Sequence, residues 1–376
     1  MVRDADGWID EAKKLRKIRI CRWCLGRLHS SDVESVEAVG SRAAAEMGIY
    51  ADDAGCQLCG GMFSRLEWLV DEAVEKLSGV ELRSFYVSVS VPYGMREMED
   101  ELRARLRLSG GISAKRLAIR MISKKVEERL GVPARSSDPD VILEFTPDGL
   151  RGISLMPMYL EGRYVKPAEE SVRGARGESQ ALESEISRSL VDAFAADGAR
   201  IMWLGTDFRG VEVVGRGRPF MAKVSGARRR VSWLHDTRMT MNPRVLAIRE
   251  LRDQRKVAMS AEKSMYDVVS IDVGPADPPG HSGRGSFEEV RRRLEELEGS
   301  ELSCGTGRAR RILRAVTEIE EGTLRALMCV EHGIDVQRIP ECAAGEGWRA
   351  SRVRVLDVVE DCLGYPLGWY VMRGSA

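Results

Sequence analysis

The sequence predicts a multidomain protein of the α+β class, and three observations lead to this prediction. Its 376 residues correspond to two or three domains at roughly 150 residues per domain. Helical and strand patterns alternate along the chain, and two closely spaced cysteine pairs mark a separate N-terminal module. Hydrophobic residues make up 43% of the chain and charged residues 31%, so it can bury a core and is not disordered throughout.

Charge and hydropathy exclude several classes of protein. Lysine plus arginine and aspartate plus glutamate each number 58, so the formal net charge is 0. This excludes a histone-like polycation but leaves nucleic-acid binding open, because basic and acidic faces can cancel in the total. No apolar run reaches the roughly 20 residues that span a bilayer, and the N-terminus lacks a signal-peptide core. We therefore expect a cytoplasmic protein with reduced thiols.

Two cysteine pairs predict a metal site. Cys21 and Cys24 form one pair, and Cys56 and Cys59 form the other, with 31 residues between the pairs. Two residues between thiolates allow both to bind one ion from a single turn, and zinc prefers four such ligands. The alternatives are two unrelated buried pairs or a redox-active pair. The remaining cysteines are expected to be free buried thiols: Cys304, Cys329, Cys342 and Cys362.

The N-terminal elements follow from periodicity. Residues 1–61 hold the cysteines and helical patterns over 8–15 and 33–47. An α/β domain is expected over 62–180, beginning with a helix over 63–77 whose apolar residues recur at helical spacing. A period-two strand then covers 85–91.

The rest of that domain continues the alternation. A helix is expected over 114–130, ended by a glycine. Strands are expected over 141–145 and 152–160, and Pro157 within the second predicts an edge position or a bulge. The polar stretch 166–180 is expected to be a linker or exposed loop.

Residues 181–376 are expected to form the third domain. A helix with one apolar face runs from Leu182 to Phe194, and a strand over 200–204 leads into Gly205-Thr206-Asp207. The stretch 274–285 is rich in glycine and proline and is expected to be a surface loop.

Basic residues gather in two stretches of this third domain. Residues 215–230 hold six basic residues and no acid, a composition that suits phosphate contacts but also an ordinary solvated loop. A second group invites the same two interpretations: Arg308, Arg310, Arg311 and Arg314. The chain has no Walker motif, no dinucleotide-binding glycine motif after a strand and no nucleophile elbow.

Six short motifs together resemble the archaeal tRNA pseudouridine synthases of the Pus-ten family. In chain order they are CLGR at Cys24–Arg27, DPDV at Asp138–Val141, GRYVK at Gly162–Lys166, GRGRPF at Gly215–Phe220, EKSMY at Glu262–Tyr266 and VRVLDV at Val353–Val358. The resemblance covers nearly the whole chain. It implies a zinc-bearing N-terminal module, a THUMP-like RNA-binding domain and a pseudouridine synthase domain with a mixed, mostly antiparallel sheet.

The implied reaction converts uracil-54 and uracil-55 in the T-loop arm of tRNA to pseudouridine. It breaks an N-glycosidic bond, rotates the uracil and rejoins it through carbon, with no organic cofactor. The base must first leave its stack. A carboxylate must then act at the sugar, an aromatic ring must hold the loose uracil, and a cation must keep the carboxylate ionised.

The resemblance places these roles on particular residues. Asp207 is the candidate catalytic acid. Aligned without a gap from the GRPF motif, the family's aspartate would fall on Phe208, and Asp207 fits if the loop carries one extra residue. Glu212 and Asp267 are the next carboxylates to consider. Tyr266 is the candidate stacking ring, for which a core tyrosine is the alternative.

The remaining candidates bind substrate or orient the acid. Arg209 or Arg218 is expected to pair with the catalytic aspartate. The family's second tyrosine belongs in the segment 321–327, where this chain has Leu324, with Arg325 in place of the family's lysine. The alternative function is therefore a tRNA-binding THUMP and zinc protein with weak or lost catalysis. A THUMP-bearing methyltransferase or thiouridine synthase is a less favoured alternative, because this chain has no glycine-rich cofactor loop and no P-loop-like pyrophosphate motif.

Overall fold

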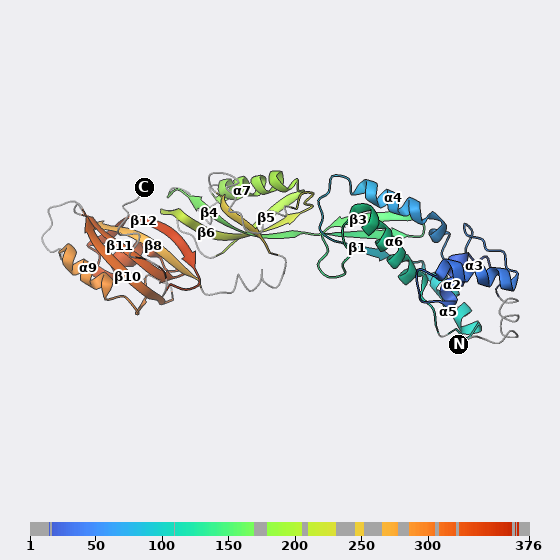
Figure 1. Ribbon diagram of the computed structural model, residues 1–376. Helices are drawn as coiled ribbons and strands as arrows, with labels where there is room; N and C mark the ends of the chain where they lie inside the picture. The colour runs from blue at the N-terminus through green and yellow to red at the C-terminus, as the bar shows by residue number, and fades with distance from the viewer. Residues whose placement is uncertain are drawn as a thin grey trace. The chain divides into compact units, whose positions relative to one another are not determined.

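The computed structural model describes most of the chain (Figure 1). The described residues are 15, 17–108, 110–168, 179–204, 210–230, 245–251, 265–276, 286–304, 308–320, 323–362, 365 and 367. They divide into two compact units. The first comprises Met1–Met156 with Arg228–Arg230, and the second comprises Pro157–Ala227 with Val231–Ala376.

Among the helices that the structure describes, none combines the length and the apolar character needed to cross a bilayer.

The first unit begins with two helices in close backbone contact, α2 (Arg22–His29) and α3 (Val36–Met47). Their contact requires glycine on both sides. A Cβ on Gly26 would lie 1.8 Å from the carbonyl oxygen of Val36, and a Cβ on Gly40 would lie 1.8 Å from that of Arg22. Any larger residue at either position would therefore force the helices apart.

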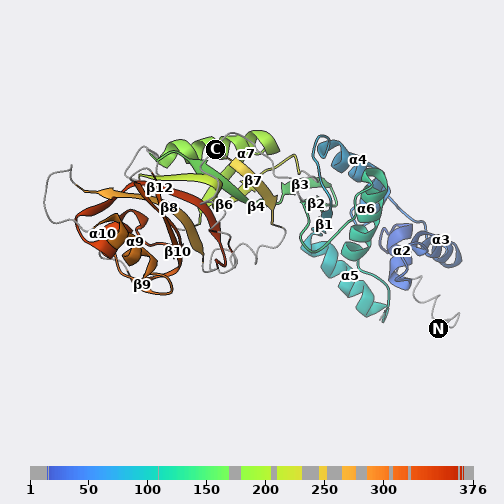
Figure 2. The ribbon, with the colours of Figure 1, turned by 60° about the vertical axis from the view of Figure 1, so that its left-hand side comes forward.

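A three-stranded sheet with flanking helices forms the rest of the first unit. Its strands are β1 (Phe85–Val89), β2 (Val141–Thr146) and β3 (Gly149–Leu155), with β1 and β2 parallel and β2 and β3 antiparallel. Two helices lie side by side against it, α6 (Ala114–Leu130) at β1 and α4 (Leu66–Lys76) at β3 (Figure 2). The short helix η1 (Met62–Arg65) precedes α4, and α5 (Tyr93–Arg105) follows β1.

One hydrophobic core joins all of these elements. It runs without interruption from Leu15 through the four N-terminal cysteines to Leu150. The expected boundary at residue 61 therefore does not separate two cores. The four cysteines and the sheet β1–β3 share one hydrophobic core. The cysteine site can therefore influence the stability of the sheet.

The second unit contains a nine-stranded mixed sheet. Its strands are β4 (Met158–Lys166), β5 (Gly198–Trp203), β6 (Val211–Ser225), β7 (Val245–Glu250), β8 (Tyr266–Pro275), β9 (Glu301–Leu302), β10 (Arg310–Glu320), β11 (Thr323–Glu331) and β12 (Trp348–Val359). The order is β7-β4-β6-β12-β8-β11-β10-β9, and β5 also pairs with β6. Among the described pairings of this sheet, β6 with β12 is parallel and the others are antiparallel. The predicted mixed, mostly antiparallel sheet is thus confirmed.

Helices cover this sheet at both of its ends. Helix α7 (Ser179–Phe194) packs on β4, β5 and β6 through one hydrophobic cluster. Helix α9 (Phe287–Glu295), η3 (Val336–Arg338) and α10 (Ile339–Ala344) pack on the part formed by β8, β10, β11 and β12. The longest strands, β6 and β12, connect the two parts of the sheet.

Two expectations from the sequence were wrong. The segment expected as one strand over 152–160 belongs to two strands, because strand structure is interrupted at Met156 and Pro157. The second of them, β4, pairs with β6 and β7 in the second unit.

The four cysteines expected as free thiols are paired in two disulfides. Cys304 pairs with Cys342 and Cys329 with Cys362, at Cα separations of 5.8 and 6.3 Å. The sequence patterns did not predict helix α5 (Tyr93–Arg105).

Gly162 on β4 is fixed by a ring on the neighbouring strand. A Cβ at this position would lie 2.4 Å from the ring of Phe220, which is wholly buried on β6. We expect Gly162→Ala to lower the free energy of unfolding by about 1–3 kcal/mol, because the buried ring has to shift. Chemical denaturation measures this. Gly198→Ala on β5, where a Cβ meets nothing within 4 Å, is the control and should be nearly neutral; equal effects would contradict the contact.

Candidate active site and metal centre

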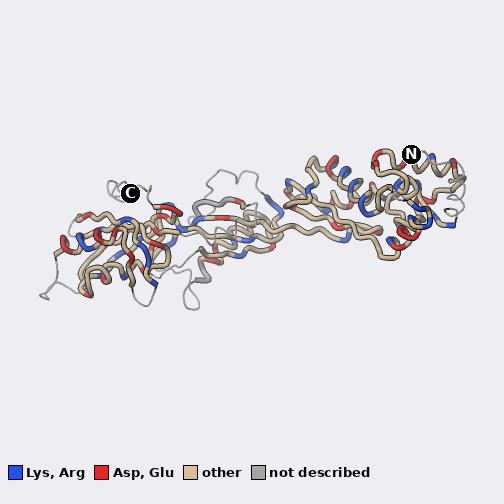
Figure 3. The backbone as a smooth tube through the Cα atoms, turned by 90° about the horizontal axis from the view of Figure 1, so that it is seen from below, with Lys and Arg blue, Asp and Glu red and all other residues tan. Residues whose placement is uncertain are grey.

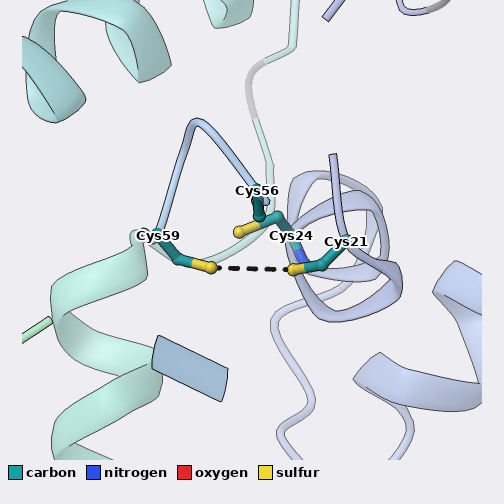
Figure 4. A group of neighbouring side chains, drawn as sticks. All are labelled: Cys21, Cys24, Cys56 and Cys59. Atoms are coloured by element: carbon teal, nitrogen blue, oxygen red, sulfur yellow. Dashed lines mark hydrogen bonds between the residues drawn. The ribbon is translucent and has the colours of Figure 1, made fainter. Parts of the chain in front are cut away.

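The four N-terminal cysteines form a compact buried cluster. Their sulfur atoms all lie within 4.8 Å of one another, and Cys21 Sγ lies 3.7 Å from Cys59 Sγ (Figure 4). A tetrahedral ion with metal–sulfur bonds of about 2.3 Å needs sulfur separations of about 3.8 Å. The cluster therefore fits a four-thiolate metal site, as the sequence predicted.

Local structure explains how two sulfur atoms come from one turn. Cys21 is the N-cap of α2, and its Sγ accepts a hydrogen bond from the backbone N–H of Cys24 at 3.2 Å. Cys56 and Cys59 lie in the turn before η1, where Gly60 and Gly61 adopt positive φ angles of 62° and 72°. The glycines permit the tight turn that directs both sulfur atoms inward.

In the second unit, three sequence motifs meet at the buried carboxylate of Asp357. Its Oδ1 accepts a hydrogen bond from Arg163 Nη1 at 2.6 Å, and its Oδ2 accepts one from the Tyr365 hydroxyl at 3.0 Å. The same Arg163 nitrogen also donates to the carbonyl of Gly217 at 3.0 Å. The GRYVK, GRGRPF and VRVLDV motifs are therefore joined through side-chain contacts.

A second buried carboxylate, Asp267, lies at the start of β8. Arg218 Nη2 donates to its Oδ2 at 2.8 Å, and His332 Nδ1 is 2.9 Å from its Oδ1. Side chains of Arg218 and Asp267 are 4% and 3% exposed, so the ion pair is desolvated. Breaking it would leave one buried charge uncompensated.

The environment of Asp267 keeps it ionised. Burial, the largest effect, acts to raise the pKa of this carboxyl. The charge of Arg218 together with the contacts to His332 outweighs burial and holds the pKa below its ordinary value. Asp267 is thus a stable anion bound to Arg218. Because that charge is already engaged by two partners, Asp267 is a structural anchor and not a free acid.

Of the predicted site residues, Arg218 and Tyr266 are linked only through the backbone of β8. Tyr266 opens β8 directly before Asp267, the partner of Arg218. Successive side chains of a strand point to opposite faces, so the Tyr266 ring lies on the other face of the sheet from this ion pair. It is half-buried and packs beside the cluster that contains Val268 and Leu356. Tyr266 therefore has part of its surface available to a ligand.

Leu324 and Arg325 lie elsewhere on the same sheet. Arg325 pairs in register with Asp272 and Leu324 with Val273, whereas Tyr266 pairs with Glu331. At about 3.3 Å per residue, six residues of strand separate Arg325 from Tyr266 by about 20 Å. Arg325 Nε also donates to Asp272 Oδ1 at 2.9 Å, and Leu324 is wholly buried. Their substrate-binding role stays a prediction that this placement does not support.

The loop that contains Asp207 falls outside the described residues. Phe208 and Arg209, the alternative acid position and the alternative partner, fall outside them as well. The role of Asp207 therefore stays a prediction. The alternative carboxylate Glu212 is described, and it pairs with Arg352 on β12 at 2.8 Å.

The basic residues predicted to contact phosphate differ in their surroundings. Arg216 is 61% exposed, and its nearest carboxylate, that of Asp357, lies 3.6 Å away. Arg230 is buried in the first unit, where its Nη1 donates to Asp140 Oδ1 at 2.9 Å and its backbone N–H donates to Glu81. Arg230 is therefore neither a solvated loop residue nor exposed for a phosphate contact, whereas most of the Arg216 side chain is exposed. Figure 3 shows basic and acidic residues interspersed along both units.

Sequence reasoning missed His332, Asp357 and the anchoring role of Asp267. Isolated histidines show no spacing signal, and their partners come from strands far apart in sequence. The aspartate of the VRVLDV motif, Asp357, was the available signal. A buried aspartate within an apolar strand requires a partner, and an arginine in another motif was the natural choice.

Comparison with known proteins finds relatives of one kind. Residues 69–145 match the family model of the archaeal Pus10 THUMP domain. The tRNA pseudouridine synthase Pus10 of Pyrococcus furiosus is 24% identical, over 81% of this chain and 79% of that protein. That of Cenarchaeum symbiosum is 25% identical, over 92% and 88%.

The solved structure of an archaeal box H/ACA Nop10–Cbf5 complex also matches, at 14% identity and a TM-score of 0.30, over 52% of this chain and 46% of that one. Residues 69–145 thus match an archaeal Pus10 THUMP domain, and most of the chain is similar to archaeal tRNA pseudouridine synthases.

The cysteine cluster and the first sheet should lose structure together. We expect Cys56→Ser to release the metal and to expose α4, α6 and β1 as well as the N-terminal helices, because all share one core and a four-thiolate metal contributes folding energy directly. Metal analysis and hydrogen exchange measure the two effects. Cys342→Ser in the second unit is the control. Retained protection of β1 in metal-free Cys56→Ser would contradict this expectation.

Asp267→Asn should destabilise the second unit by about 3–5 kcal/mol at neutral pH, because the buried Arg218 loses the carboxylate charge that compensates it. Since the folded-state pKa of Asp267 is lowered, its contribution is present above the unfolded pKa of about 3.9 and is lost as pH falls through the folded pKa. The difference between parent and variant should therefore shrink in acid. Urea unfolding at several pH values measures it. The double variant Arg218→Met/Asp267→Asn should recover stability; failure to recover would contradict the pairing.

Proposed function

We propose that this protein is a tRNA pseudouridine synthase that isomerises uracil-54 and uracil-55 in the T-loop arm. The observation that carries this proposal is the convergence of the family's motifs on one part of the second sheet. Arg163 binds Asp357 and the carbonyl of Gly217, which joins three of these motifs, and Arg218 binds Asp267, the residue that follows Tyr266. The similarity of the chain to the Pus10 synthases of Pyrococcus furiosus and Cenarchaeum symbiosum, and the match of residues 69–145 to the Pus10 THUMP domain, support the same function.

The chemistry is assigned to the residues as follows. Asp207 acts as the carboxylate at the ribose, where it stabilises or attacks the sugar carbon as the N-glycosidic bond breaks. Tyr266 stacks on the detached uracil while the base rotates. Arg218 does not serve as the mobile partner of Asp207, because Asp267 already binds it at 2.8 Å. It holds the start of β8, and hence Tyr266, in place.

In the first unit we assign zinc to the four-cysteine site and tRNA binding to the domain that follows it. Four buried thiols at tetrahedral separations favour zinc over harder ions such as magnesium or calcium. The ion is structural, because four protein ligands leave no open position for substrate. No organic cofactor enters the proposed reaction.

Asp207→Asn should abolish pseudouridine formation while tRNA affinity stays within a few-fold of the parent. The substitution keeps size and hydrogen-bonding shape but removes the charge needed in bond breaking. Carbodiimide-based primer extension on T-arm transcripts measures activity, and filter binding measures affinity. Glu212→Gln is the matched control, because that carboxylate pairs with Arg352. Full activity of Asp207→Asn would exclude it as the catalytic acid.

A specific observation keeps the binding-only alternative open. The segment that carries the family's second tyrosine has Leu324, and this side chain is wholly buried. If the parent binds tRNA but forms no pseudouridine in the same assay, the protein is a tRNA-binding member of the family. Measuring both pseudouridine formation and tRNA affinity on the same preparation distinguishes an enzyme from a protein that only binds tRNA.

Arg216 should contact tRNA phosphate, and Arg230 should not. We expect Arg216→Ala to reduce the slope of log affinity against log salt by about 1, since each phosphate contact releases counterions. Arg230→Ala should leave that slope unchanged and lower the stability of the first unit, because it breaks a buried ion pair with Asp140. Salt titrations of binding and thermal unfolding test both. Equal slopes for parent and Arg216→Ala would contradict the contact.

A further inference from the structure

A wholly buried arginine lies directly beside the four-cysteine site. The Arg27 side chain is 0% exposed, and its Nε donates to Cys24 Sγ at 3.3 Å. It is the last residue of the CLGR motif, one helical turn after Cys24. Burying a guanidinium group destabilises the folded state unless its positive charge is compensated. The groups that contact Arg27 therefore indicate its role.

One partner is the metal site itself. Four thiolates around a divalent cation carry a net charge of 2−, and this charge is buried with the cysteines. Hydrogen bonds from an outer group orient metal ligands and tune the site, and the Nε–H···S contact is of that kind. Nη2, which shares an edge of the guanidinium with Nε, has no hydrogen-bond partner among the described residues. This donor is available to a ligand sulfur.

The other partners belong to α5 and to the segment that joins α5 to α6. Arg27 Nη1 lies 2.7 Å from Glu99 Oε1 of α5, and it also donates to the carbonyl oxygen of Ile112 at 3.3 Å. The backbone N–H of Ile112 donates to the Arg27 carbonyl at 2.9 Å. Arg27 thus holds this segment through both its side chain and its backbone.

Glu99 extends the network into two helices. Its Oε1 pairs with Arg103 at 3.0 Å, and its Oε2 accepts from the backbone N–H of Ala114, the first residue of α6, at 3.3 Å. Arg103 Nη2 in turn donates to the Ile112 carbonyl at 2.9 Å. The charges therefore alternate from the thiolates through Arg27 and Glu99 to Arg103.

We propose that Arg27 is a positioning residue that couples metal occupancy of the four-cysteine site to the folding of α5 and of the segment 110–114. With metal bound, the thiolate charge compensates Arg27, and Arg27 in turn fixes Glu99. Without metal, the guanidinium loses its anionic partner on the sulfur side, and the link to α5 weakens. The ion thereby stabilises a helix that supplies no ligand to it.

The experiment compares two arginines of the same helix. Arg27→Met removes the charge and keeps a long apolar side chain, whereas Arg22→Met removes a half-exposed arginine that pairs with Glu37 and Asp53. Transfer of zinc to a chromophoric chelator gives the release rate, and hydrogen exchange gives the protection of α5 (Tyr93–Arg105) with and without metal. Both readouts use the full chain and need no tRNA.

We expect Arg27→Met to release zinc about 10–100-fold faster than the parent, as for other residues that orient metal ligands, and to lose α5 protection even with zinc present. Arg22→Met should behave like the parent, in which protection of α5 falls on metal removal. Zinc release and α5 exchange unchanged in Arg27→Met would overturn the proposal.

If Arg27→Met does not fold, Glu99→Gln tests the coupling between the metal site and α5 instead. It keeps the shape of the side chain and the contact of Arg27 with Cys24, but it removes the anion on the α5 side. Faster exchange of α5 with zinc still bound supports the coupling through Arg27 and Glu99. Unchanged α5 exchange in zinc-bound Glu99→Gln would overturn it.

Discussion

The second unit depends on buried carboxylates that hold arginines from distant strands. Asp267 binds Arg218, and Asp357 binds Arg163, so that β4, β6, β8 and β12 are joined at their side chains as well as their backbones. A buried charge without a partner is strongly destabilising. Each of these residues therefore needs its partner, and the motifs that supply the two partners depend on each other in this chain.

This constraint explains why residues near the site are not all chemical participants. Arg218 and Asp267 neutralise each other, and their contribution is to keep β8 in place at Tyr266. Arg216 is exposed instead and remains suited to a phosphate. Two arginines in one short motif thus have different roles, and burial distinguishes them.

The first unit uses the same principle around a metal. Its cysteines, Arg27 and Glu99 form an alternating set of charges inside a continuous hydrophobic core. A module that can be outlined in the sequence by its cysteines is consequently not independent of the sheet that follows. Metal, helices and sheet are expected to gain or lose structure together.

The sequence by itself determined the elements with strong local signals. Helix α6 begins and ends where the pattern over 114–130 and the glycine after it predicted, and the four-cysteine cluster follows from two short spacings. Short-range periodicity and ligand spacing are properties of neighbouring residues, so they are visible without a fold. The family motifs likewise predicted the mixed sheet.

Only the tertiary structure decided which distant residues meet. It separated β3 from β4 at Pro157, paired Arg230 with Asp140, joined Asp267 to His332, and placed Leu324 and Arg325 far along the sheet from Tyr266. Each outcome depends on strand order and register between segments tens to hundreds of residues apart. Composition and spacing within a segment carry no information on that register, because it is set by the packing of the whole sheet.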